Sequence, residues 1–171
     1  MKLSINQSQI AVAFLPKATY ESKVNGLVSA VVARSKKVCY ISINKPYSVL
    51  GESFKKSKID TKKILFIDCV TGKVSGDSKY NVLVVSSPKA LTELSIVIGD
   101  TIKKPENFVV FDSLSTLLAY HDSSTAIKFI HSLVSKIRST KNGCIFICLK
   151  EDKDSELMKD VSMFVDKMFN A

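Results

Sequence analysis

The stretch that decides the fold runs from Phe108 to Ser115 and reads FVVFDSLS. Its four consecutive apolar residues are typical of a strand buried on both faces, as in a parallel sheet that is covered by helices. Asp112 follows this run directly, at the carboxyl end of the strand, where open α/β sheets bind their ligands. The stretch therefore predicts a central parallel strand with one candidate site residue at its end.

Outward from this stretch, apolar runs alternate with segments of helical periodicity. Besides 108–112, we expect strands at 9–15, 38–43, 64–68, 81–86 and 144–149, and an edge strand within 163–169. Helices are expected at about 20–34, 47–57, 88–102 and 123–141, with a short one from Asp154, whereas 71–79 reads as a surface loop or hairpin. This alternation predicts a single domain over 1–171, a three-layer αβα sandwich with a mostly parallel central sheet.

Composition indicates an ordinary globular protein, with 46% hydrophobic and 24% charged residues. No apolar run approaches the ~18 residues of a membrane helix, and the first residues do not form a signal peptide, so we expect no membrane association. The four cysteines each lie in or at the end of an apolar run and predict reduced core residues in a cytoplasmic protein: Cys39, Cys69, Cys144 and Cys148.

The positive charge is concentrated in the first half of the chain. Residues 1–89 contain 15 Lys or Arg against 5 Asp or Glu, whereas 90–171 contain 10 against 11. Segment 34–63 is the richest, and it contains lysine almost exclusively, although arginine is the residue that reads bases bidentately. Either a solvated lysine face or a nucleic-acid interface explains this segment. The candidate surface residues for a partner or a nucleic acid are Lys45, Lys55, Lys56 and Tyr47, an aromatic residue expected to be exposed.

A phosphate-binding loop is not found where it is expected, directly after the first strand. Such a loop needs glycines so that successive N–H groups converge on the phosphate. The segment 16–22 reads PKATYES and contains no glycine. Pro16 lacks an N–H donor, and Glu21 brings a negative charge to the place where an anion would bind. The segment reads as an ordinary turn from a strand to a helix.

The order of elements resembles the core of RecA-superfamily ATPases, especially the KaiC-like proteins of archaea. Residues 108–115 resemble their Walker B strand, and the resemblance implies that Asp112 is the acid on the magnesium side and Ser113 the hydroxyl that follows it. Residues 19–22 lie where the Gly-Lys-Thr of Walker A belongs.

The strand and loop at 38–47 resemble the segment that carries the catalytic glutamates in that group. The resemblance would place the catalytic acids at Asn44 and Lys45, and neither residue is a general base at neutral pH. Asp112 then also reads as a cap for the segment 113–115.

Three functions follow from these observations. The first is a regulatory or protein-interaction module that has lost Walker A and the catalytic glutamates, has no cofactor, and binds a partner protein or itself rather than acting as an enzyme. The second is a divergent ATP-binding protein or weak ATPase, with magnesium at Asp112 and nucleotide contacts from Asp112, Ser113, Lys17 and Ser22. The third is a nucleic-acid-binding module that uses the lysine-rich segment 34–63.

Overall fold

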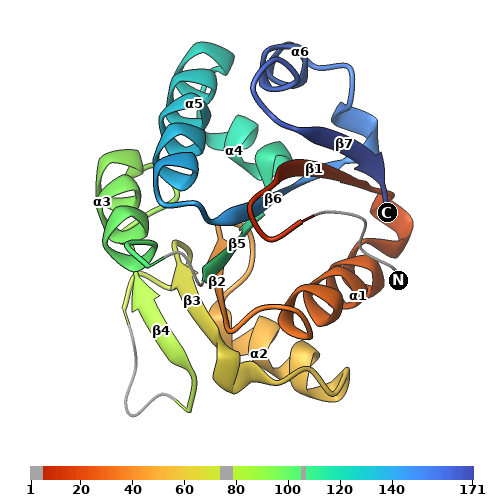
Figure 1. Ribbon diagram of the computed structural model, residues 1–171, viewed down its shortest axis with the longest axis vertical. Helices are drawn as coiled ribbons and strands as arrows, with labels where there is room; N and C mark the ends of the chain where they lie inside the picture. Colours follow the sequence, from red (N-terminus) through yellow and green to blue (C-terminus); the bar gives the residue numbers. More distant parts are fainter. Residues whose placement is uncertain (1–5, 74–78, 105–106) are drawn as a thin grey trace.

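The computed structural model describes residues 6–73, 79–104 and 107–171. Within them the chain forms a seven-stranded sheet in which every pair of neighbouring strands is parallel (Figure 1). The strands are β1 (Ile10–Leu15), β2 (Lys37–Ser42), β3 (Ile64–Asp68), β4 (Asn81–Val84), β5 (Asn107–Asp112), β6 (Gly143–Leu149) and β7 (Lys167–Asn170). The predicted α/β class is confirmed, and all the strand pairings of the described sheet are parallel.

Helices cover both faces of the sheet, whose strand order is β4-β3-β2-β5-β6-β1-β7. On one face lie α1 (Tyr20–Val32) and α2 (Tyr47–Lys56). On the other lie α3 (Leu91–Thr101), α4 (Leu114–Tyr120), α5 (Ser123–Ser139) and α6 (Glu156–Val161) (Figure 1). Three short 3-10 turns complete the described chain: η1 (Lys17–Thr19), η2 (Thr61–Lys63) and η3 (Lys150–Asp152).

The central strands are buried on both sides, as their continuous apolar runs predict. Along β5, Phe111 contacts the core beneath α3 to α6, whereas Val110 contacts the core beneath α1 and α2. Both side chains are fully buried, and burial of a side chain of this size stabilises a fold by roughly 1.5–3 kcal/mol. The four cysteines are buried, which confirms their predicted place in the core, and none of them forms a disulfide with a described residue.

The structure decides two points that the sequence left open. The segment 71–79 was expected to be a surface loop or a hairpin, and the parallel pairing of β3 and β4 excludes the hairpin; residues 74–78 lie outside the described residues. Helix α4 begins directly after β5, and the side chain of Ser113, not that of Asp112, caps it by accepting from the Thr116 N–H at 3.2 Å. The C-terminal edge strand is confirmed as β7, which pairs with β1.

Helix α2 is held against the end of the β3–β4 connection by a close contact at Gly51. The Tyr80 ring lies so near that a Cβ at position 51 would come within 2.4 Å of it. That ring is itself held in place, because its hydroxyl donates to Glu52 at 2.7 Å and its edge contacts Phe66.

We therefore predict that Gly51→Ala destabilises the fold by about 1–3 kcal/mol, because the Tyr80 ring has to move. Gly26 is the matched control, since it also lies inside a helix but a Cβ added there would meet no atom within 4 Å. Gly26→Ala is expected to stabilise the protein by about 0.5–1 kcal/mol. Urea denaturation measures both changes; equal effects of the two substitutions would contradict the packing argument.

Candidate functional site

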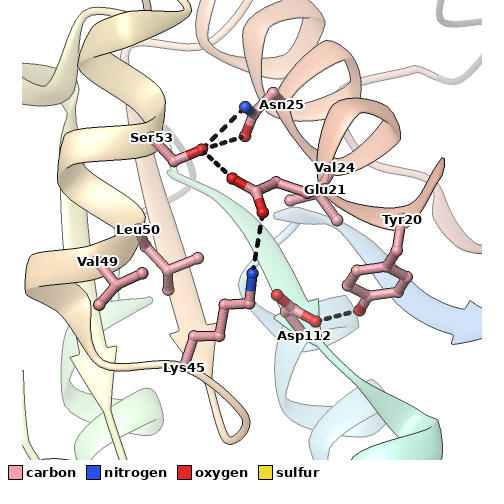
Figure 2. Close-up of a pocket in the computed structure, with 9 residues that line it drawn as sticks. All are labelled: Tyr20, Glu21, Val24, Asn25, Lys45, Val49, Leu50, Ser53 and Asp112. Atoms are coloured by element: carbon pink, nitrogen blue, oxygen red, sulfur yellow. Dashed lines mark hydrogen bonds and ion pairs between the residues drawn. The ribbon is translucent and has the colours of Figure 1, made fainter. Parts of the chain in front are cut away.

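The candidate site lies at the carboxyl edge of the sheet, where β5 ends at Asp112. Its carboxyl is buried and accepts three hydrogen bonds from side chains of the chain itself. The Tyr20 hydroxyl, at the start of α1, and Asn44 Nδ2, at 2.9 Å, both donate to Oδ1. The Tyr40 hydroxyl donates to Oδ2 from the neighbouring strand β2, at 2.5 Å. Figure 2 shows Tyr20 pointing from α1 toward the carboxyl.

Burial governs the electrostatics of this constellation. It raises the pKa of Asp112, while the hydrogen bonds from Tyr20, Tyr40 and Asn44 act in the opposite sense. Burial, followed by the nearby Asp112 carboxylate, raises the pKa of both tyrosines, so each hydroxyl keeps its proton and remains a donor. The arrangement is thus a carboxyl surrounded by neutral donors, with no cation bound directly to it among the described residues.

A second set of polar side chains, which lines the same cleft as Asp112, forms contacts between α1 and α2. Lys45 Nζ lies 3.3 Å from Glu21 Oε2, and the Ser53 hydroxyl donates to Glu21 Oε1 at 3.0 Å. Asn25 Nδ2 donates to Ser53 at 3.0 Å, so the set links the two helices (Figure 2). The cleft beneath these contacts has a volume of only about 10 Å³ for a water-sized molecule. Such a volume admits about one water molecule and no nucleotide.

The residues present do not fit a magnesium nucleotide. Both oxygens of Asp112 are already engaged by donors from the chain. Within the described residues, no group of three or more His, Cys, Asp or Glu side chains is placed to hold a metal ion. Tyr20 occupies the start of α1, the position from which a phosphate loop would face the acid, and Glu21 in the same first turn would repel a phosphate.

The structure brings together only two of the four residues predicted to bind nucleotide. Asp112 and Ser113 are adjacent and buried. Lys17 is exposed in η1, and Ser22 is exposed in α1, where its hydroxyl donates to the Thr19 carbonyl at 3.3 Å. Neither Lys17 nor Ser22 lines the cleft beside Asp112.

The predicted partner surface contains one clear error. Tyr47 is not an exposed aromatic residue: it is buried, and its ring meets the Tyr80 ring edge to face at 6.3 Å. Lys55 lies over the Tyr80 ring, with Nζ 4.9 Å from the centre of that ring. Lys56 is exposed at the end of α2, and Lys45 is engaged by Glu21.

A second buried carboxyl, Asp68 at the end of β3, fixes the backbone at Tyr47. Asp68 Oδ2 accepts from the Tyr47 N–H at 2.7 Å, and Oδ1 accepts from the N–H groups of Val70 and Thr71 at 2.7 and 2.8 Å. The Thr71 hydroxyl adds a bond to Oδ2 at 2.6 Å. Asp68 therefore anchors the start of α2 and the loop after β3, which is a structural role.

Sequence reasoning missed Tyr20 and Tyr40 as members of the site. A signal for Tyr40 was present, because a tyrosine inside an otherwise apolar strand must find a partner for its hydroxyl. Tyr20 carries no comparable signal. Its contact with Asp112 joins residues 92 positions apart and depends on how α1 lies across the sheet.

The fold and this edge define an α/β protein with a parallel sheet in which the chain's own side chains surround the acid at the carboxyl edge. Residues 58–169 match a protein family of unknown function, DUF7504, and the chain belongs to this family. The match includes Asp112 but begins after Tyr20, Tyr40 and Asn44. No curated protein matches the chain. Among the described residues, no helix has the length and apolar character that crossing a membrane requires.

The environment of Asp112 makes a prediction about stability. Asp112→Asn replaces an accepting oxygen with an NH₂ group that faces a hydroxyl donor, and we expect a loss of about 1–3 kcal/mol. The exposed Asp154, with 86% of its side chain accessible, is the matched control, and Asp154→Asn is expected to change stability by less than about 0.5 kcal/mol. Chemical denaturation of the three proteins measures both effects.

The same variant reports the raised pKa of Asp112. Because burial raises the pKa of the Asp112 carboxyl, the folded protein binds the proton of this carboxyl more tightly than the unfolded chain does. In the unfolded chain, the pKa of an Asp side chain is near 3.8. The contribution of that proton to stability is complete below about pH 4 and is lost as pH rises through the pKa of the folded state. The stability difference between wild type and Asp112→Asn should therefore narrow as pH rises from about 4. A difference that widens would place the pKa of Asp112 below its ordinary value.

Proposed function

We propose that this chain is a non-catalytic protein of the RecA-like class that acts through contacts with a partner protein or with further copies of itself. The observation that carries the proposal is the filled site: Tyr20, Tyr40 and Asn44 supply to Asp112 the contacts that a magnesium nucleotide would otherwise make. Because side chains of the protein itself already donate hydrogen bonds to Asp112, this residue does not require a cofactor at the carboxyl edge of the sheet.

The parallel sheet is compatible with the RecA-like part of the proposal, because the strand that ends at Asp112 lies at its centre. Here β6 lies between β1 and β5, and β2 follows on the far side of β5. This arrangement supports our proposal that Asp112 corresponds to the Walker B acid.

Two features weigh against the other functions. A divergent ATPase would need a cation near Asp112, but the nearest lysine on the cleft, Lys45, is held by Glu21 at 3.3 Å. A nucleic-acid interface on α2 would need the exposed ring of Tyr47 for stacking, and this ring is buried. The interaction module is the function that remains consistent with both observations.

The test is magnesium-dependent ATP hydrolysis by the purified chain, measured as phosphate release. We expect wild type and Asp112→Asn to give the same signal as buffer, because Asp112 has no free oxygen for a metal ion. Turnover by the wild type that is lost in Asp112→Asn would overturn the proposal and favour the divergent ATPase.

Self-association is measured in parallel by sedimentation velocity over a range of protein concentrations. A mass that rises with concentration would identify the chain as its own partner. A constant monomer mass would direct the search toward a different protein.

A further inference from the structure

The opposite edge of the sheet carries a much larger hollow than the filled site. Here, where β2, β3, β4 and β5 begin, a groove offers about 570 Å³ to water-sized molecules. Binding pockets for small molecules have volumes of about 300–1,000 Å³, so the groove is of the right size for one. Its lining includes apolar residues at the starts of β2 and β3: Val38, Cys39, Ile64 and Leu65.

The charged rim of this groove is strongly positive. It contains four lysines, Lys37, Lys62, Lys63 and Lys104, and one acidic side chain, Asp100. The Asp100 carboxylate is itself neutralised, because Lys103 Nζ lies 2.7 Å from it. A concave surface lined by one sign of charge raises the local concentration of counterions, so this groove attracts anions.

One of the four lysines has a structural explanation. Lys63 Nζ donates to the carbonyls of Val32 and Ser35 at 3.3 and 3.4 Å, at the carboxyl end of α1. A cation is favourable there because helix carboxyl ends carry a partial negative charge.

The other three lysines have no such explanation. Lys37, Lys62 and Lys104 are exposed, and their ammonium groups make no hydrogen bond or ion pair with any described residue. They come from three segments, the start of β2, the turn η2 and the chain after α3, which the fold brings to one groove.

The chemistry of the lining selects among anions. Three polar side chains, those of Asn81, Thr101 and Asn107, join the lysines, but the described lining includes neither an aromatic ring nor an arginine. Bases need aromatic platforms for stacking and bidentate donors for reading their edges. Lysine, in contrast, binds phosphate as a point charge. The groove therefore suits a compact chain of phosphates better than a nucleic acid.

We propose that this groove binds a small molecule that carries a short chain of phosphate groups, held by Lys37, Lys62 and Lys104. The site is independent of the filled edge at Asp112, since the two lie at opposite ends of the strands and share no lining residue. The proposal gives this chain a ligand-binding function that does not need the lost phosphate loop.

Titration calorimetry with inorganic tripolyphosphate and the full chain at low salt tests the proposal. Wild type should bind, and each of Lys37→Gln, Lys62→Gln and Lys104→Gln should weaken binding by about tenfold, as expected for the loss of a charge-assisted contact. The triple variant should bind more than about a hundredfold more weakly. These side chains are exposed and unpaired among the described residues, so the variants should melt at the wild-type temperature.

The matched control removes the same charge elsewhere. The triple variant Lys89→Gln, Lys128→Gln and Lys159→Gln changes three exposed lysines outside the groove and should retain wild-type binding. An equal loss in this control would overturn the proposal, because the overall charge of +9 would then explain the attraction. Absence of any binding by the wild type at low salt would overturn it as well.

Two further arms separate the alternatives. Oligo-dT that binds more tightly than tripolyphosphate, with affinity that rises with length and falls steeply with salt, would replace the proposal by a nucleic-acid interface. Asp112→Asn should leave tripolyphosphate binding unchanged. Binding that is lost in Asp112→Asn but retained in the triple variant of Lys37, Lys62 and Lys104 would overturn the proposal, because it would place the phosphate site at the carboxyl edge. The ATP hydrolysis assay would then decide separately whether the carboxyl edge is catalytic.

Discussion

The structure depends on the burial of one carboxyl at the centre of the sheet. Asp112 lies at the end of β5, between β2 and β6, with almost no exposed surface. A buried acid is costly unless donors surround it. Tyr40 supplies one from β2, Asn44 one from the loop after β2, and Tyr20 one from α1. Satisfying this acid therefore fixes the position of the first helix on the sheet.

Asp68 anchors the start of α2, just as Asp112 anchors the start of α1. It accepts the Tyr47 N–H at the start of α2, while Glu21, Lys45 and Ser53 join the two helices at the surface. Together these contacts close the carboxyl edge, where ligands bind in most open α/β sheets. The amino edge has the opposite character: it is hollow, positively charged and, among the described residues, without partners for three of its lysines. The two ends of the sheet thus differ in both shape and charge.

The regular elements could be predicted because their signals are local. Continuous apolar runs identified the buried strands, and the spacing of apolar residues identified α5, whose buried face includes Phe129, Ile130 and Leu133. The errors arose where a neighbour distant in sequence decides the outcome. Tyr47 next to a proline in a basic loop looks exposed, but Tyr80 and Asp68 hold it inside. For 71–79 the sequence left a surface loop or a hairpin open, and only the parallel pairing of β3 with β4 excludes the hairpin.

The amino-acid sequence by itself determined the α/β class, the burial of the central strands and the lack of a glycine loop after β1, because each depends on residues that are neighbours in the chain. It also placed an acid at the end of β5. Only the tertiary structure decided what that acid does, since Tyr20 reaches Asp112 across 92 positions. The lysine groove, too, exists only in three dimensions, because β2, η2 and the chain after α3 meet only when the sheet forms.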